Sequence, residues 1–215
     1  MRRCDAAFKK EILLKCYDAL ESEGFTRYRK EDVDWPLHDG FHCWVGLNTG
    51  LHPDRVNVNP FVGIHAVPIM RLYTKLEGRT YSRSVATYAV HMGELAGARE
   101  ERATALTPEQ SDGFVTSETR RLARLYATVG LDYARSIASY EALLPLLQGR
   151  LDMLGGYPER VASCLYLMGR KAEAKAFAEE FLAKQREYFE AFAVPFLRML
   201  ANGDASEPLS RQAGR

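Results

Sequence analysis

All five histidines lie in the first 91 residues, and they are the side chains of this sequence best suited to acid–base or metal chemistry. Imidazole titrates near neutral pH, so His42, His65 or His91 could act as acid and base with a carboxylate such as Asp39. Two such histidines beside a carboxylate in a polar pocket would support this hypothesis. Scattered, solvent-exposed histidines would contradict it.

A zinc site is a second interpretation of the same region, because His38, His42, Cys43 and His52 offer nitrogen and sulfur ligands. The spacing argues against it. If residues 41–48 form a β-strand, His42 and Cys43 point to opposite faces and cannot bind one tetrahedral ion. We therefore expect no metal site, and histidines that lie at the surface or are hydrogen-bonded.

Motifs that would fix a reaction are absent from the sequence. It contains neither a GxSxG nucleophile elbow nor the phosphate-binding patterns GxGxxG and GxxxxGK[ST]. Cys43 lies inside an apolar run, which disfavours a catalytic cysteine–histidine pair. The carboxylates of residues 31–34 (EDVD) are interpreted as a solvated turn. We predict no cofactor and no catalytic residue that a motif identifies.

Composition narrows the class of protein. Hydrophobic residues make up 47% and charged residues 27% of the 215 residues, as in ordinary globular proteins. The net charge of +1 offers no cationic excess for nucleic acid. The apolar settings of Cys16, Cys43 and Cys164 indicate core thiols in a reducing compartment. A charged N-terminus and apolar runs far shorter than the ~20 residues of a membrane span predict a cytoplasmic protein without a membrane partner.

The first 97 residues predict a helix followed by a small antiparallel sheet. Residues 5–23 have helical apolar spacing, with Asp5 as N-cap and Gly24 after the last turn. Residues 41–48, 56–64 and 85–92 alternate apolar and polar side chains, as half-buried strands do. Pro60 should make the second of these an edge strand or break it. Residues 25–35 add a further strand, and residues 68–76 form a short helix closed by Gly78.

The second half of the chain predicts helices alone. Residues 98–113 are polar and read as a connection, residues 114–203 as a helical region packed on the first part, and residues 204–215 as a disordered tail. Gly130 and Gly169 should end helices, Ser139 should cap one, and Pro158 suits a first turn. Pro195 should kink or interrupt the last helix. The expected fold is α+β, in one compact unit, with the helical bundle after the sheet.

The strand alternation also predicts which side chains leave the core. If the valines of residues 56–64 point inward, Trp44 and Phe61 point outward among polar side chains: His42, Asn48, Asn57 and Asn59. Aromatic anchors ringed by amides are typical of protein-binding patches. We name these six residues the Trp44 face and predict that it binds another protein. The alternative is that the C-terminal helices cover this face and make it the edge of the core.

Two resemblances accompany these patterns. The opening helix, Gly24-Phe25, and the segments WVGLN (44–48) and VNPFVG (58–63) are similar to those of small uncharacterised bacterial α+β proteins, some encoded beside toxin or defence genes. That resemblance covers about the first 95 residues and implies an immunity- or antitoxin-like binder. Residues 158–187, with YLMGRKAEA at 166–174, resemble one tetratricopeptide helical hairpin. One copy does not form a solenoid, which needs about three.

Three functional hypotheses follow. The first is a non-enzymatic protein that binds a partner protein, such as an inhibitor of a bacterial toxin or effector, through the Trp44 face or the 98–113 connection. The second is the enzyme with a histidine–carboxylate pair. The third is a helical adaptor over residues 117–201, which predicts a groove between helices lined by exposed Phe189, Phe192 or Phe196. Burial of all three would argue against it.

Overall fold

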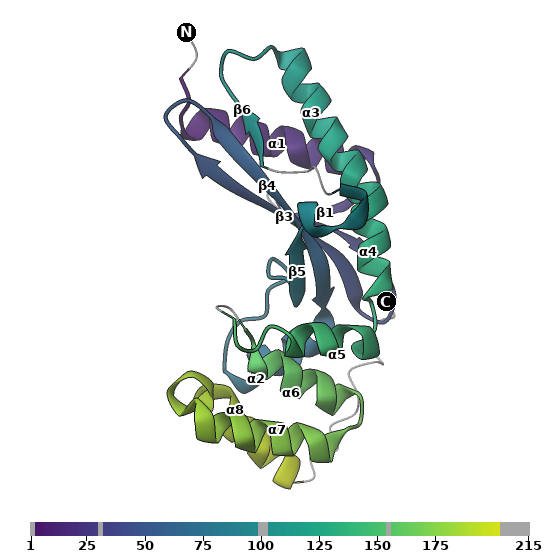
Figure 1. The fold of residues 1–215 in the computed structure, drawn as a ribbon, viewed down its shortest axis with the longest axis vertical. Helices are drawn as coiled ribbons and strands as arrows, with labels where there is room; N and C mark the ends of the chain where they lie inside the picture. Colours follow the sequence, from purple (N-terminus) through teal and green to yellow (C-terminus); the bar gives the residue numbers. More distant parts are fainter. Residues whose placement is uncertain (1–2, 30–31, 99–102, 154–155, 203–215) are drawn as a thin grey trace. The chain divides into compact units, whose positions relative to one another are not determined.

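A computed structural model of the chain describes residues 3–29, 32–98, 103–153 and 156–202. It has an N-terminal helix, an antiparallel sheet of six strands and a C-terminal series of helices, so the α+β prediction is confirmed (Figure 1). The predicted disordered tail at residues 204–215 lies outside the described residues. No helix in the described ranges is both long and apolar enough to span a bilayer.

The first helix, α1 (Ala6–Ser22), begins and ends where local signals place it. The Asp5 carboxylate accepts the amide hydrogen of Phe8 at 2.9 Å, which satisfies one of the free N–H groups of the first turn. Gly24 follows the helix with φ of 99°, a conformation that glycine adopts without a steric penalty. Both predicted end signals are confirmed.

The sheet has the strand order β1-β2-β3-β4-β5, and β6 pairs with β4 beside this path. The predicted strand over residues 25–35 is two antiparallel strands, and β6 lies inside the stretch predicted as a connection. The strand bounds are β1 Thr26–Arg29, β2 Asp32–Pro36, β3 Phe41–Leu51, β4 Val56–Ala66, β5 Tyr88–His91 and β6 Thr104–Leu106.

Pro60 neither breaks β4 nor places it at an edge, so that prediction is wrong. The strand runs through Pro60 and has β3 on one side and β5 and β6 on the other. Its pairing with β6 covers Val56 to Val58. The β6 ladder therefore stops before the residue that has no N–H to donate.

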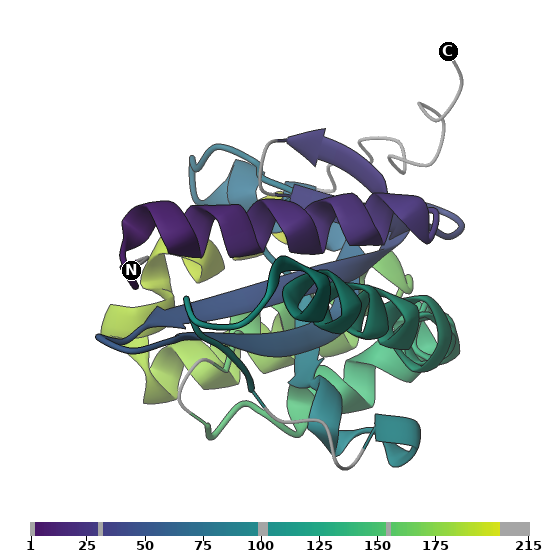
Figure 2. The ribbon, with the colours of Figure 1, turned by 90° about the horizontal axis from the view of Figure 1, so that it is seen from above.

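Helical segments between residues 112 and 136 cover one face of the sheet. They run from α3 (Asp112–Leu125) through a π-helical turn (Tyr126–Gly130) into α4 (Leu131–Ser136), and α3 packs beside α1 (Figure 2). Gly130 was predicted to end a helix, but the helical path continues. A Cβ at this glycine would lie 3.2 Å from Met92 Cε and 3.3 Å from Val62 Cγ2, so the glycine serves close packing.

Two of the remaining helices have end signals at predicted residues. Ser139 accepts the amide hydrogen of Ala142, Pro158 occupies the first turn of its helix, and Gly169 follows that helix with φ of 77°. The helix that contains Pro195 continues on both sides of it, so the predicted interruption is wrong. The bounds are α2 Val67–Leu76, α5 Tyr140–Gln148, α6 Pro158–Leu167, α7 Lys171–Lys184 and α8 Arg186–Ala201, with short 3₁₀ turns at Met92–Glu94 and Ala96–Ala98.

Contacts group the chain into two compact units. The first comprises Met1–Leu37, His42–Ile64 and Ala89–Ser136, and the second comprises His38–Phe41, His65–Tyr88 and Ile137–Arg215. Within the second unit, Phe189, Phe192 and Phe196 are all buried. The helical-adaptor hypothesis needs at least one of these side chains exposed, so the burial of all three argues against it.

Candidate functional site

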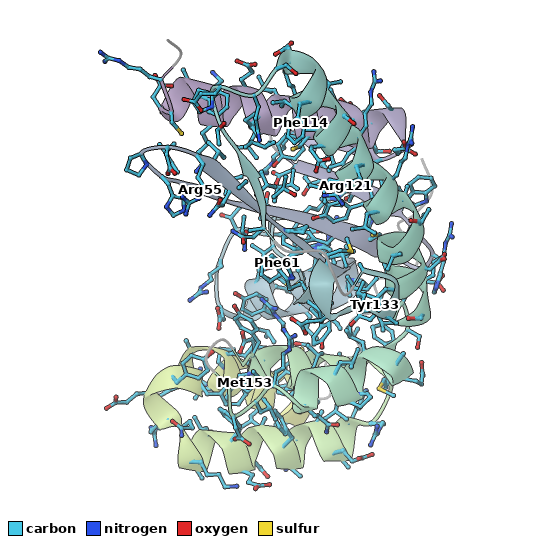
Figure 3. All side chains as sticks on the ribbon, turned by 45° about the horizontal axis from the view of Figure 1, so that its top comes forward. Arg55, Phe61, Phe114, Arg121, Tyr133 and Met153 are labelled. Atoms are coloured by element: carbon cyan, nitrogen blue, oxygen red, sulfur yellow. The ribbon has the colours of Figure 1, made fainter. Side chains whose placement is uncertain are left out.

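The alternation predicted for β3 and β4 is present in the first unit. On β3, Cys43 and Val45 are buried while Trp44 is half-buried and Asn48 exposed; on β4 the valines are buried and Phe61 is half-buried. The residues of the Trp44 face therefore share one side of the sheet, and Phe61 is labelled in Figure 3. This placement agrees with the strand parity on which the binding prediction depends.

Gly46 leaves the space in which Trp44 and Phe61 approach each other. A Cβ on Gly46 would overlap the indole ring of Trp44 and would lie 3.2 Å from the Cβ of Phe61. One edge of the indole ring thus lies over the glycine of its own strand, close to Phe61 on the neighbouring strand. Gly46 is two residues after Trp44 on the same face, and this spacing of tryptophan and glycine is the sequence signal for such a contact.

His91 extends the aromatic cluster from a third strand. Its ring meets Phe61 edge-on, with centroids 5.2 Å apart and an interplanar angle of 89°. Its Nδ1 accepts the amide hydrogen of Gly93 at 3.1 Å, and its own amide donates to Glu94 Oε1. The His91 ring is therefore held by a capping box at the start of a 3₁₀ turn, in a role that is structural as well as part of the aromatic cluster.

The asparagines of the Trp44 face organise the β3–β4 hairpin. Asn59 Nδ2 donates to the backbone carbonyl of Asn48 at 3.1 Å, and Asn57 Nδ2 lies 3.2 Å from Nε2 of His52. These side chains bridge the two strands near the hairpin end. They place polar groups in fixed positions beside Trp44 and Phe61, as a specific polar rim requires.

The position of Asp34 contradicts one prediction. The acidic segment was expected to be a solvated turn, but Asp34 lies in β2, is 2% exposed and pairs across strands with Trp44. Glu31 of the same segment lies outside the described residues. The Asp34 Oδ2 is 3.4 Å from Nδ1 of His42, whose side chain is 16% exposed. Alternation within β2 turns Val33 to the core and Asp34 to the side of the Trp44 face, where His42 gives it a partner.

The enzyme hypothesis finds its residues in separate settings. His42 pairs with Asp34 rather than with Asp39, which is exposed and lies 3.3 Å from the exposed His38. His65 is buried in the second unit, against Tyr81 and the backbone carbonyl of Val85. His42 thus lies beside a buried carboxylate, that of Asp34, and not beside the Asp39 carboxylate that the hypothesis named.

Metal and thiol chemistry have little support in the part of the chain that the structure describes. There, no three His, Cys, Asp or Glu side chains are grouped so that they could hold a metal ion. Cys16, Cys43 and Cys164 are buried free thiols, as predicted. Burial raises the pKa of the Cys43 thiol to about 12, so this thiol is protonated at neutral pH and is a poor nucleophile.

Sequence reasoning missed one surface feature of the first unit. An open groove follows α3 and is lined mainly by hydroxyl and guanidinium groups: Asp112, Gly113, Thr116, Ser117, Arg120, Arg121 and Arg124. Figure 3 labels Arg121 and the exposed Phe114 on this helix. The arginines recur at helical spacing, which is the signal that could have indicated it. Ion pairs of Arg121 with Glu118 and of Arg124 with Glu23 reduce the net positive charge of the groove.

No protein-family model, curated protein or solved structure matches this chain. The resemblance to small bacterial α+β proteins therefore stays a prediction, and the candidate site stands on its geometry alone.

Proposed function

We propose that this chain is a non-enzymatic protein-binding module whose Trp44 face docks a partner protein. The single observation that supports the proposal is the half-buried cluster of Trp44, Phe61 and His91, fixed over Gly46 and bordered by amides. Tryptophan dominates interface energetics because it buries a large rigid area at low entropic cost. The complementary partner surface presents an apolar side chain to the two aromatic rings and hydrogen-bonding groups to the asparagines.

A bacterial cytoplasm is the proposed setting, with an immunity- or antitoxin-like role against a toxin or effector. Four free cysteines support a reducing compartment, because an oxidising one favours disulfides. The inhibitor role rests on the resemblance of residues 1–95 to proteins encoded beside toxin or defence genes. Such a role requires a stable surface and no chemistry.

Replacing Trp44 by alanine should weaken partner binding by about 2 kcal/mol or more, which is about thirtyfold in Kd. The partner is first captured from the native host with the wild-type chain and then purified, so that Kd can be measured by calorimetry. Gly46→Val keeps Trp44 but displaces its indole ring, and it should weaken binding in the same direction.

Phe114→Ala is the matched control, because Phe114 is an exposed aromatic residue of the same unit that lies on α3 and not on the strands that carry the Trp44 face. It should leave Kd unchanged. A partner that binds Trp44→Ala and Gly46→Val as tightly as wild type would rule out this face. If no protein is captured at physiological salt, the binding proposal itself loses its basis.

The His42–Asp34 pair favours a second candidate function, an enzyme that uses this imidazole as general acid or base. The purified chain would then hydrolyse some member of a panel of chromogenic carboxylic and phosphate esters. His42→Gln, which retains a side chain of similar size, should reduce that rate by about a hundredfold. Equal rates for wild type, His42→Gln and buffer would leave this candidate without support.

A further inference from the structure

A buried imidazole in the second unit holds a tyrosine hydroxyl. His65 lies near the end of β4 and is 1% exposed. Its Nδ1 is 2.7 Å from the carbonyl oxygen of Val85. A carbonyl oxygen only accepts hydrogen bonds, so Nδ1 must carry the proton. In the neutral ring this assignment makes Nε2 a hydrogen-bond acceptor.

That acceptor nitrogen faces Tyr81. The Tyr81 hydroxyl oxygen lies 2.8 Å from Nε2, so the phenol donates its hydrogen to the imidazole. The ring planes meet at 58°, with centroids 5.6 Å apart. The backbone carbonyl thus orients the imidazole, and the imidazole in turn is placed to receive the phenol proton. This is the geometry of a nucleophile and its base, in which a third group fixes the base.

The hydroxyl groups of two other tyrosines have a different kind of partner. Tyr126 donates to the carbonyl oxygens of Gly46 and Phe61, and Tyr188 donates to that of Gly156. A peptide carbonyl can accept such a hydrogen bond but cannot take the proton away. An imidazole nitrogen can do both. The partner at Tyr81 is therefore chemically distinct from those at Tyr126 and Tyr188.

Charge and access also favour reaction at Tyr81. The guanidinium carbon of Arg71 lies 5.3 Å from the centre of the Tyr81 ring. Positive charge at this place stabilises negative charge that develops on the phenol oxygen or on an incoming anionic group. Tyr81 is half-buried, Arg71 is exposed, and His65 is buried.

We propose that Tyr81 is a nucleophilic tyrosine that accepts a phosphoryl group from an activated phosphoryl donor, with His65 as its general base. The phenol oxygen forms the new bond to phosphorus, and the bond between phosphorus and the leaving group breaks. The leaving group departs with that electron pair, and the phenol proton moves to Nε2 of His65. The proposal is independent of partner binding at the Trp44 face.

The test uses a biotinylated fluorophosphonate, in which fluoride is the leaving group, on the full-length chain. Peptide mass spectrometry follows labelling of each tyrosine with time. Tyr81 should react at least tenfold faster than Tyr188, which is 58% exposed but donates to a carbonyl. His65→Gln should slow labelling of Tyr81 by about a hundredfold or more, because an amide oxygen accepts the hydrogen bond but does not take the proton.

Two further variants separate reactivity from structure. Tyr81→Phe should abolish the label at this peptide and leave the others unchanged. His65→Asn retains an N–H donor toward Val85 but has no base at the position of Nε2, so it should keep the circular dichroism spectrum and lose the fast labelling. If His65 only held the loop in place, the folded Gln and Asn variants would label like wild type, and the proposal would be overturned. If neither variant folds, the comparison of Tyr81 with Tyr188 in the wild-type chain still decides it: equal rates overturn the proposal.

Discussion

Replacing Phe192 by alanine should lower the free energy of unfolding of the second unit by about 3–5 kcal/mol. Phe192 is 1% exposed and lies in the middle of α8. Its ring centroid is 5.5 Å from that of Phe189 and 5.1 Å from that of Phe196, to which it stacks at 23°. Removing it leaves a cavity between two rings that are themselves buried, and their positions on the same helix limit how far they can close it.

Urea denaturation followed by far-UV circular dichroism measures this loss. Phe114→Ala is the matched control, since Phe114 is 47% exposed and its loss should change stability by less than about 0.5 kcal/mol. Both tryptophans, Trp35 and Trp44, belong to the first unit, so tryptophan fluorescence reports that unit separately. A Phe192→Ala variant within about 1 kcal/mol of wild type would contradict the packing described for α8.

Helix ends could be predicted from the sequence because their signals are local. Asp5, Ser139, Pro158 and Gly169 act on backbone groups within a turn of themselves, and each has the predicted role. Gly130 has the same residue type as Gly169 but faces Met92 and Val62, which are distant in sequence. A glycine that serves close packing therefore cannot be told from one that ends a helix without knowing the fold.

The candidate site, too, could be predicted only where it depends on local sequence patterns. Strand alternation placed Trp44 and Phe61 on one side because the period of two depends only on neighbouring residues. The contact of Trp44 with Gly46 and the burial of Asp34 depend on how strands pair, and charge alone suggested a solvated Asp34. The hydrogen bond between His65 and Tyr81 joins residues 16 apart in sequence on either side of α2, and no local pattern indicates it.

The other large effect concerns a buried carboxyl group at the start of α6. Glu159 is 7% exposed, and burial raises its pKa from an ordinary 4.5 to about 7. Arg160 and Arg79 oppose the rise through their positive charge, whereas Glu77 adds to it. Burial dominates because removing a carboxylate from water costs more than nearby cations return at this site.

The sign of the resulting pH dependence follows from the proton count. Between pH 4.5 and about 7 the folded protein keeps the Glu159 proton while the unfolded chain has lost it. The folded state binds more protons in this window, so its stability falls as pH rises and becomes flat above pH 7. A difference of about two and a half pKa units corresponds to about 3 kcal/mol.

Glu159→Gln should therefore remove most of this slope, because the amide resembles the protonated acid in shape and never ionises. Compared with wild type, the variant should be similarly stable near pH 4.5 and more stable by about 3 kcal/mol at pH 8. Burial also raises the pKa of Glu77, which adds a slope of the same sign to both proteins, so the quantity of interest is the difference between them. Urea denaturation by circular dichroism at several pH values between 4.5 and 8 measures it. Parallel stability curves for the two proteins would show that Glu159 ionises normally and that the start of α6 is open to water.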